Sequence, residues 1–537
     1  MSNRFSFNML RRSFLVLAII LFAGNAHNIQ AQDTLRLSIE TNEYWWGGLS
    51  ADGAHMPYSA STNLERNLLG HNYYNQAQPL LISSQGRYIW SEKPIHYRFK
   101  SGELTVTSRQ GKITLGRGNH SLAGAYNKAK EQFFPPRGEH PHQLMFTAPQ
   151  YNTWIELMYN QNQADILAYA KHIIDSGNPP GVIMIDDNWQ QDYGVWKFSA
   201  KRFSDPKKMI DRLHDMGFKV LLWVVPFVSP DSRTYRALAD KKLLLANQSG
   251  EPAMIRWWNG VSAVLDLSNP QARDWFKDQL DHLTEEYNVD GFKFDAGDAR
   301  FYNGDYQSYK PSLPNDHTTY FAQIGLDYPL NEYRASWKMA GYPLAQRLRD
   351  KSHNWGDLQT LIPDIIAQGL MGYAFTCPDM IGGGQFKSFL DDATIDQELI
   401  VRSAQVHALM PMMQFSVAPW RVLSDQNQKI VNHMARLHSE MGEQIMELVR
   451  HSAQTGEPIV RAMAYEYPDA GYAMVKDQFM LGSEIMVTPV VQKDQRTRKV
   501  QIPKGRWTAD NGEKFTGPAT VQIDVPLSRL PWFKKDG

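Results

Sequence analysis

The chain has 537 residues, more than a single hydrophobic core usually holds, so several domains are expected. Lysine plus arginine and aspartate plus glutamate number 56 each, and this neutral balance gives no reason to expect nucleic acid or an anionic membrane surface as a partner. The 15 Trp, 24 Tyr and 24 Phe residues would mostly fill cores, but aromatic rings also suit the C–H faces of sugars.

The N-terminus has the pattern of a secretory signal peptide. Three arginines precede an apolar run over residues 14–22, and small residues then allow cleavage after Ala26 or Ala31. This run is too short to cross a bilayer comfortably, and no later run is long and apolar enough to be a membrane span. Cys377 is the only cysteine, so an intrachain disulfide is excluded. We predict a signal peptide over residues 1–31 and export to a bacterial periplasm or to the medium.

Residues 32–143 predict an N-terminal β-domain. Short segments with period-two alternation are separated by Gly, Asn and Ser, as in residues 34–40, 97–100, 104–107 and 112–115. Alternation of this kind with frequent turn signals is typical of antiparallel strands, and we expect a β-sandwich.

From residue 144 the pattern changes to strands that alternate with helices. Strands are expected near residues 144–147, 181–186, 218–224, 291–295, 330–334, 373–376 and 409–415. Helices are expected near residues 163–176, 206–216, 271–287, 357–368 and 426–452. So many βα units in one stretch favour a closed (β/α)8 TIM barrel over residues 144–454.

Short alternating strands return after residue 455. They are expected near residues 474–479, 485–488, 499–502 and 520–525. The predicted fold class is therefore α/β, with a (β/α)8 TIM barrel between an N-terminal and a C-terminal β-sandwich, the latter over residues 455–537.

Polar and aromatic residues gather where the predicted barrel strands end, which is where barrel enzymes place their chemistry. They are Trp154, Asp186, Asp187, Trp223, Asp295, Asp298, Arg334 and Asp350. A metal hydrolase would need histidine-rich ligation there, and the only His-x-His, at His140 and His142, precedes the first predicted strand. No phosphate-binding loop or nucleophile elbow occurs, so we expect neither a metal nor an organic cofactor.

Several carboxylates with aromatic residues in an exported barrel indicate glycoside hydrolysis. One carboxylate attacks or stabilises an oxocarbenium-like carbon, while a second, protonated one donates its proton to the leaving oxygen. Any single Asp could instead cap a helix after a strand. The occurrence of several together favours a site for a carbohydrate substrate.

The chain resembles glycoside hydrolase family 31, the retaining α-glycosidases, over nearly its whole mature length. The stretches that carry the resemblance are Tyr151–Trp154, Ile185–Trp189, Asp266–Pro270, Asp290–Asp298, Pro378–Gly383, Gln478–Gly482, Val487–Val490 and Pro503–Trp507. Within the family the resemblance is strongest to the branch that contains α-galactosidase-like enzymes.

This resemblance assigns catalytic roles. It implies that Asp295, at the end of the fourth strand, is the nucleophile and that Asp350, ahead of Trp355–Leu358, is the acid/base. The family's fifth-strand arginine, sixteen positions before the acid/base, falls on Arg334.

The resemblance also assigns substrate-binding residues. It implies that Asp186, with Asp187 beside it, and Trp258 contact sugar, and that Asp379 is a structural carboxylate of the sixth strand. The predicted substrate-binding residues are Asp186, Asp187, Lys293, Arg334, Asp298, Trp258, Trp154 and Trp223.

Three departures from the family's α-glucosidases bear on the sugar. Lys293 stands where they carry Trp, and Ala296–Asp298 replaces Met-Asn-Glu. Gln414–Ser416 stands where they carry Arg-Asn-His after the seventh strand. We therefore expect an α-galactoside as substrate, with an α-glucoside or α-xyloside as the alternative. Lys293 would either bond a sugar hydroxyl or pair with a buried carboxylate, Asp186 or Asp298.

Two further alternatives stay open. Trp45 or Trp46, in a Gly-rich loop of the N-terminal domain, could touch substrate or pack in the core. The whole scaffold could also be that of a catalytically inactive glycan-binding protein. The presence of Asp295, Asp350 and Arg334 at the family's spacing favours the enzyme.

Overall fold

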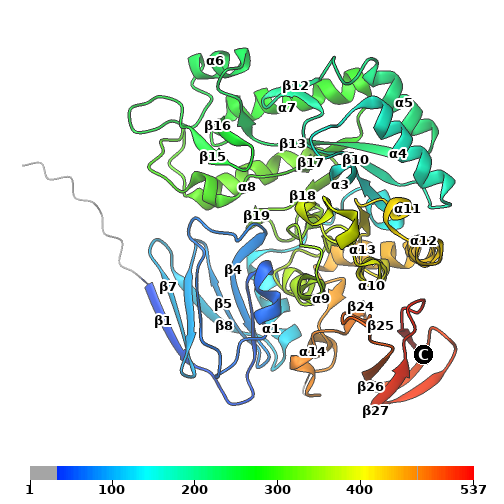
Figure 1. Cartoon of the computed structure of the whole chain (residues 1–537). Helices are drawn as coiled ribbons and strands as arrows, with labels where there is room; N and C mark the ends of the chain where they lie inside the picture. Colours follow the sequence, from blue (N-terminus) through cyan, green and yellow to red (C-terminus); the bar gives the residue numbers. More distant parts are fainter. Residues whose placement is uncertain (1–32, 469, 537) are drawn as a thin grey trace, which may run out of the picture.

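The computed structural model describes residues 33–468 and 470–536 (Figure 1). The predicted signal peptide lies outside these residues. An N-terminal β-domain, drawn in blue, lies next to the barrel. The C-terminal sheet, drawn in red, lies below the yellow helices, on the side away from the green part of the barrel (Figure 1).

The N-terminal domain consists of two sheets, as predicted. One has the strand order β1-β7-β6-β3, and the other has the order β19-β4-β5-β8 with β2 paired to β4. The strands are β1 (Asp33–Ser38), β2 (Trp45–Leu49), β3 (Leu64–Asn67), β4 (Gln76–Ser83), β5 (Arg87–Ser91), β6 (His96–Lys100), β7 (Glu103–Ser108) and β8 (Ile113–Arg117). Every second side chain of β7 is buried, which accounts for the period of two in the sequence. A helix that the sequence analysis missed, α1 (Leu122–Phe133), follows β8.

The barrel sheet has eight parallel strands in the order β21-β20-β18-β17-β13-β10-β9-β22, so the predicted (β/α)8 barrel is confirmed. The strands are β9 (Gln150–Asn152), β10 (Val182–Ile185), β13 (Lys219–Val224), β17 (Gly291–Phe294), β18 (Leu330–Tyr333), β20 (Gln346–Arg347), β21 (Thr376–Cys377) and β22 (Gln414–Phe415). At the seam between β21 and β22, the backbone N–H of Ile381 donates to the carbonyl of Gln414 at 2.8 Å.

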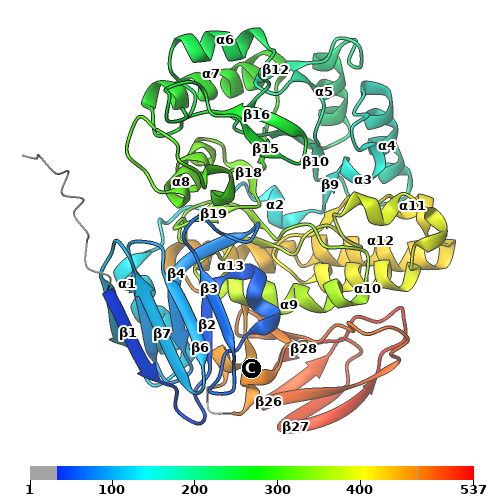
Figure 2. The ribbon, with the colours of Figure 1, turned by 60° about the vertical axis from the view of Figure 1, so that its left-hand side comes forward.

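Helices surround the barrel sheet (Figure 2). They include α4 (Gln163–Asp175), α5 (Pro206–Asp215), α7 (Pro270–Tyr287), α8 (Pro314–Ile324), α9 (Trp355–Leu370), α10 (Gln397–Ala408), α12 (Asp425–Glu440) and α13 (Gly442–Thr455). Four of these helices begin at a capping side chain: Asn162, Asp205, Asn269 and Asn354 each accept a hydrogen bond from a backbone N–H of the first turn.

Three predictions about the barrel were wrong. Residues 144–147 form a short helix, α2 (Leu144–Thr147), and the first strand is β9. The predicted long helix over 426–452 is two helices that break at Met441. Strand β20 was missed because two residues are too few to show a period. As a consequence, Asp379 follows the seventh strand instead of the sixth, and Gln414 lies in the eighth.

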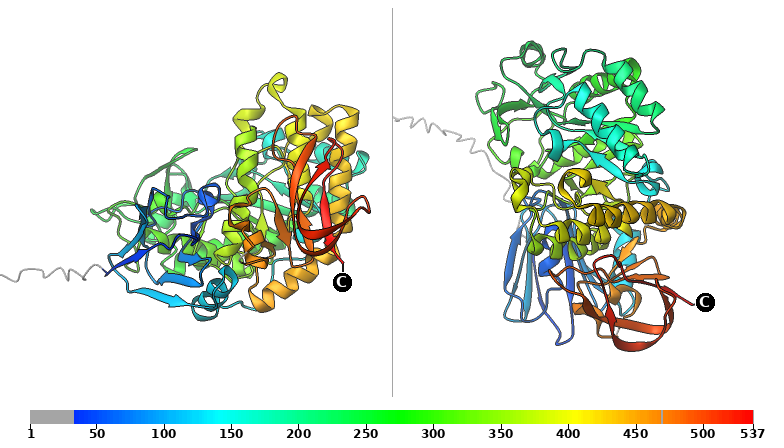
Figure 3. Two further views of the ribbon diagram at one scale, coloured as in Figure 1. Left: turned by 90° about the horizontal axis from the view of Figure 1, so that it is seen from below. Right: turned by 45° about the vertical axis from the view of Figure 1, so that its right-hand side comes forward.

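The C-terminal β-domain is built from one six-stranded antiparallel sheet instead of two separate ones. Its strands are β23 (Val460–Arg461), β24 (Phe479–Leu481), β25 (Ile485–Val487), β26 (Thr497–Ala509), β27 (Lys514–Asp524) and β28 (Trp532–Lys535). The strand predicted over 474–479 starts only at Phe479. The sheet lies beside the yellow and orange helices (Figure 3), where Arg402 of α10 donates to the carbonyl of Val525 at 2.9 Å.

The N-terminal domain also supports the barrel mouth. Strand β19 (Ser336–Trp337), which follows barrel strand β18, pairs in parallel with β4. Beside it the Gln76 amide donates to the carbonyls of Arg334, at 2.8 Å, and Arg347, at 3.0 Å. Both arginines belong to the cavity described below, so the N-terminal sheet fixes their backbone. Within the described ranges 33–468 and 470–536, no helix has both the length and the hydropathy that crossing a membrane requires.

Candidate active site

A cavity of about 520 Å³ opens at the carboxyl ends of the barrel strands. The side chains that line it are Tyr74, Trp154, Tyr159, Asp186, Asp187, Trp223, Trp258, Lys293, Asp295, Arg300, Arg334, Arg347, Arg349, Asp350, Met380, Gln385, Phe386 and Lys387. Of the ten predicted site residues only Asp298 is not among them, so the chain places the predicted residues together.

Asp295 follows β17 and is held at both carboxylate oxygens. Trp223 donates its indole N–H to Oδ2 at 3.0 Å, and Arg334 donates from Nε to Oδ1 at 2.9 Å. Burial raises the pKa of Asp295, but Arg334, Lys293 and Arg347 together outweigh burial and hold that pKa well below its ordinary value. The carboxylate is therefore ionised and fixed in position, as a nucleophile must be.

The turn after Asp295 explains its Ala-Gly sequence. Ala296 and Gly297 have φ values of 58° and 69°, in the left-handed region. The N–H of Ala296 donates to Oδ1 of Asp295 at 2.8 Å. A Cβ on Gly297 would come within 2.4 Å of the Phe321 ring, so only glycine fits without displacement. After this turn, Asp298 accepts from the same arginine, Arg334, that holds Asp295.

Asp298 does not line the cavity but binds Arg334, which does. Its carboxylate is fully buried and accepts from both terminal nitrogens of Arg334, at 2.8 Å and 3.3 Å. Arg334 also donates to the carbonyl of Tyr74 at 2.7 Å. The prediction that Asp298 contacts substrate is thus replaced by a positioning role: it orients the guanidinium that holds Asp295.

Asp350 lies past the end of β20 in a different environment. Its side chain is 36% exposed, against 15% for Asp295, and its Oδ1 accepts from Nη1 of Arg347 at 2.9 Å. Arg347 is 1% exposed and also pairs with Glu332 and Asp379, at 3.1 Å and 2.6 Å. The two predicted catalytic carboxylates therefore face one cavity but are anchored by different arginines.

Lys293 pairs with Asp186 inside the barrel. Its Nζ lies 2.6 Å from Oδ2 of Asp186, and both side chains are at most 5% exposed. Burial lowers the pKa of Lys293, but Asp186, helped by Glu332 and Asp295, leaves the pKa above its ordinary value. Of the two alternatives from sequence, the structure shows the pair with Asp186, and both side chains still line the cavity.

Asp187 is tied to a neighbouring loop. The Asn259 amide donates to its Oδ2 at 2.5 Å and the Tyr193 hydroxyl to its Oδ1 at 3.2 Å. Burial and the adjacent Asp186 raise the pKa of Asp187 to about 7. Asn259 lies at the tip of the hairpin formed by β15 (Ile255–Trp257) and β16 (Gly260–Val264), next to Trp258. These bonds hold the hairpin tip against the cavity.

The three predicted tryptophans differ in exposure. Trp223 is 1% exposed and serves Asp295 through its N–H, whereas Trp258 is 43% exposed. Trp154 packs edge-on against Tyr159 and Phe386 at ring-centroid distances of 5.3 and 5.5 Å. Trp258 and Trp154 therefore offer the cavity aromatic surface on which a sugar face can pack.

The N-terminal domain reaches the cavity through a residue that was not predicted. Trp45 and Trp46 are 0% and 3% exposed in the core, and neither lines the cavity. Tyr74, from the loop before β4, lines the cavity instead.

Other missed residues come from loops and from two short 3-10 helices, η2 (Ala299–Tyr302) and η4 (Phe386–Phe389). Arg300, Arg349, Met380, Gln385, Phe386 and Lys387 line the cavity, as does Arg347 from the short β20. Loop residues carry no period, so no sequence signal marked them except that Arg347 and Arg349 stand close to Asp350.

A barrel that brings two separately anchored carboxylates into one aromatic, arginine-rich cavity has the arrangement of a glycosidase site. Among residues 33–468 and 470–536, no group of three or more His, Cys, Asp or Glu side chains is placed to hold a metal ion.

Comparison with known families agrees with this class. Residues 144–441 match the model of the TIM-barrel domain of glycosyl hydrolases family 31, and residues 456–537 match the C-terminal domain of the same family. The chain belongs to glycosyl hydrolase family 31.

One similar protein is named as an enzyme, and another is named as a binding protein. The chain is 32% identical over 443 residues to the myogenesis-regulating glycosidase of Mus musculus, covering 80% of this chain and 61% of that protein. It is 29% identical over 325 residues to the SITS-binding protein of Tetronarce californica, covering 56% of this chain and 45% of that protein. The chain thus spans about half to three fifths of these relatives.

Among solved structures, an α-xylosidase of this family from a soil metagenome, in complex with xylose, superposes with a TM-score of 0.82 at 20% identity. The superposition covers 94% of this chain and 79% of that one. At this identity the likeness establishes the fold alone.

Proposed function

We propose that the protein is a retaining exo-acting α-glycosidase whose substrates are α-galactosides. One observation carries the proposal: Asp295, kept ionised by Arg334, shares a cavity with Asp350, which is more exposed and is held by a different arginine. A double displacement needs such a division between a permanent anion and a group that exchanges a proton.

Each residue then has a step. A carboxylate oxygen of Asp295 attacks the anomeric carbon, and the bond to the leaving oxygen breaks as Asp350 donates its proton to that oxygen. Asp350, now ionised, takes a proton from water, and the water oxygen attacks the same carbon and releases Asp295. Two inversions give net retention. Arg334 and Trp223 keep Asp295 in position throughout.

The preference for galactose is inferred from the departures in the cavity wall. Gln414 stands where α-glucosidases of this family carry the Arg-Asn-His stretch. It does not line the cavity, because its side-chain amide donates to the side chains of Glu332 and Gln150. In its place the wall presents the Lys293–Asp186 pair to the sugar. α-Glucosides and α-xylosides are the alternative substrates.

The substrate is tested with 4-nitrophenyl α-galactoside, α-glucoside and α-xyloside, and the anomer of the released sugar is read by NMR. We expect the α-galactoside to be cleaved with the highest kcat/KM and the α-anomer to appear first. A β-anomer as first product would contradict the mechanism, and a higher kcat/KM for another sugar would contradict the preference.

The role of Asp350 has a sharper test. Nitrophenolate leaves without a proton, whereas a sugar alkoxide needs one. Asp350→Ala should therefore lose about 10²–10⁴-fold in kcat on an α-linked disaccharide and far less in the bond-breaking step on the 4-nitrophenyl glycoside. Equal losses on both substrates would remove Asp350 from the acid role.

A glycan-binding protein without activity is the rival from another class; one relative is named for binding SITS and not for an enzymatic activity. Sugar binding by calorimetry, with no turnover of any α-glycoside, would establish that rival instead.

We propose further that the protein is exported, because residues 1–31 have the pattern of a signal peptide. Mass spectrometry of protein isolated from its source should find a mature N-terminus at His27 or Gln32. An intact Met1 would refute export by this route.

A further inference from the structure

The wall of the cavity carries six basic side chains, and these fall into two groups. Lys293, Arg334 and Arg347 form the inner group, and each is ion-paired. The outer group, Arg300, Arg349 and Lys387, has no carboxylate within the 4.0 Å of an ion pair among the described residues 33–468 and 470–536. We call these three the mouth cations.

The inner group is rich in carboxylates. Its three basic side chains pair with six acids: Asp186, Asp295, Asp298, Glu332, Asp350 and Asp379. An anionic substituent on the sugar that meets Asp295 would be repelled there. Any anion the cavity accepts therefore belongs farther out, near the mouth cations.

Two mouth cations belong to segments that flank Asp350: a Cβ on Gly384, three residues before Lys387, would lie 3.0 Å from Oδ1 of this carboxylate. Arg349 immediately precedes Asp350, and Lys387 follows Phe386, whose ring packs on Trp154; both basic side chains are exposed. Because the acid/base must meet the leaving oxygen, side chains around it surround the leaving group. Burial raises the pKa of Asp187 to about 7, so at neutral pH this carboxylate carries only part of a full negative charge.

The guanidinium of Arg300, the third mouth cation, is held in place by two aromatic rings. It lies over the Tyr74 ring, 4.0 Å from the centroid, and 4.5 Å from the centroid of Phe301. Its Nε is buried and has no hydrogen-bond partner in the described part of the chain. A buried donor without a partner is costly, and an anionic ligand would reduce that cost.

We propose that the leaving group of the natural substrate carries an anionic group, a carboxylate or a sulfate ester, which Arg349 and Lys387 bind and Arg300 attracts. This inference rests on the proposed glycosidase function and deepens it: the enzyme would remove a terminal neutral α-linked sugar from an acidic one. Guanidinium and ammonium groups are suited to such oxygens, and unpaired cations at a cavity mouth also speed the arrival of an anionic substrate.

The test uses three α-galactosyl disaccharides that differ only in the leaving sugar: glucose, glucuronate and glucose 6-sulfate. At low salt, kcat/KM for at least one anionic substrate should exceed that for the neutral one by about tenfold, and added salt should reduce this ratio. The glucuronate and sulfate arms decide which anion is recognised. A ratio of one or below at low salt overturns the inference.

Variants locate the effect. In Arg349→Gln/Lys387→Gln the ratio of anionic to neutral kcat/KM should fall toward one. Lys429→Gln, an exposed lysine of α12 far along the chain from the cavity residues, should leave the ratio unchanged. If the double variant keeps the full ratio, the mouth cations do not bind the leaving group.

Failure of the inference and failure of the proposed function are distinguishable. Cleavage of all three disaccharides without a preference leaves the glycosidase standing and refutes the anionic leaving group. If none is cleaved, the same compounds are titrated into Asp295→Asn by calorimetry. Tighter binding of an anionic one than of the neutral one then supports the charge preference, and equal binding refutes it.

Discussion

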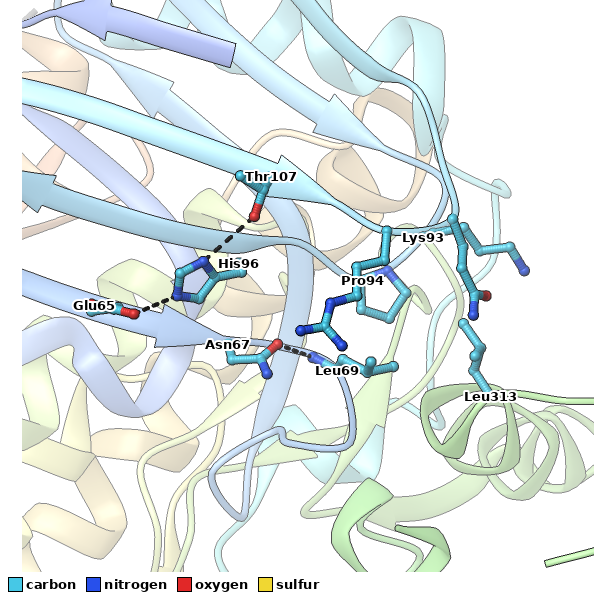
Figure 4. Close-up of a pocket in the computed structure, with 10 residues that line it drawn as sticks. Glu65, Asn67, Leu69, Lys93, Pro94, His96, Thr107 and Leu313 are labelled. Atoms are coloured by element: carbon cyan, nitrogen blue, oxygen red, sulfur yellow. Dashed lines mark hydrogen bonds and ion pairs between the residues drawn. The ribbon is translucent and has the colours of Figure 1, made fainter. Parts of the chain in front are cut away.

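Two hollows of similar size lie in different parts of this molecule. The barrel cavity has a volume of about 520 Å³, and a second hollow of about 410 Å³ lies on the N-terminal sheet against Leu313 (Figure 4). The second is lined by Glu65, Asn67, Leu69, Lys93, Pro94, His96, Thr107, Arg109, Gln110 and Leu313. Volume alone does not tell them apart.

What separates them is how their charges are held. In the second hollow His96 meets Glu65 at 2.7 Å, but their side chains are 38% and 58% exposed, so water screens the pair. In the barrel cavity Lys293 and Asp186 are at most 5% exposed, and Lys293 also feels the charges of Arg347 and Glu332, which form a buried ion pair of their own. Buried, mutually constrained charges mark a site far better than a hollow does.

The reason is topological. Parallel strands all deliver their carboxyl ends to one mouth, so residues more than a hundred positions apart, such as Asp186 and Lys293, meet there. The N-terminal hollow is formed by antiparallel strands whose facing side chains are mostly solvated. The following predictions use matched substitutions in the two hollows, in order of decreasing expected effect.

Removal of Asp295, the proposed nucleophile, should give the largest difference. Asp295→Ala is expected to lower kcat on the best α-glycoside by roughly 10⁴-fold or more, because the covalent step is lost. Glu65→Ala, a carboxylate of the N-terminal hollow, should stay within twofold of wild type. Steady-state kinetics of both purified variants decide this; near-normal activity of Asp295→Ala would reassign the nucleophile.

Loss of the arginine that holds the nucleophile should change the pH profile. Arg334 keeps the pKa of Asp295 below its ordinary value, so in wild type Asp295 stays ionised even in mild acid. In Arg334→Gln that pKa rises, and the acidic limb of kcat/KM should move to higher pH, with a loss of about 10²-fold at neutral pH.

The same pair contributes to stability with a defined sign. Because the pKa of folded Asp295 is depressed, the pair stabilises the protein above the pKa of the unfolded carboxyl, and this contribution is lost as pH falls toward the folded value.

For the pH profile of kcat/KM, Arg109→Gln in the N-terminal hollow is the control, and an unmoved acidic limb in Arg334→Gln would contradict the assignment.

The buried pair inside the barrel should matter chiefly for folding. Lys293→Met leaves Asp186 buried without its cation, and we expect the free energy of unfolding to fall by about 3–5 kcal/mol. Lys93→Met, in the N-terminal hollow, should change it by less than about 0.5 kcal/mol. Urea denaturation followed by circular dichroism measures both, and comparable values for the two would show that the buried pair adds nothing.

The exposed tryptophan should give the smallest change. Trp258→Ala removes one aromatic face, worth about 0.5–1.5 kcal/mol, so KM should rise about two- to twelvefold while kcat changes less. Leu69→Ala in the N-terminal hollow should leave KM as it is. A fall in kcat with unchanged KM would instead place Trp258 in the chemical step.

Some elements could be predicted from sequence because their cause is local. The helices at 206–215 and 270–287 each begin with a capping Asp or Asn followed by proline, and the strand at 219–224 is a continuous apolar run. Strand β20 could not be predicted, since its two residues are strand only through pairing with β18 and β21.

By itself the sequence determined the order of the domains, the barrel class and the position of Asp295 at a strand end, because spacing and period are properties of the local chain. Asp350 was found only through the family's spacing, since the strand before it, β20, was not predicted. Only the tertiary structure decided that Asp298 holds Arg334, that Lys293 pairs with Asp186 and that Tyr74 and the mouth cations line the cavity. Those contacts join residues far apart in the chain, and whether a buried charge finds a partner depends on packing that no local pattern encodes.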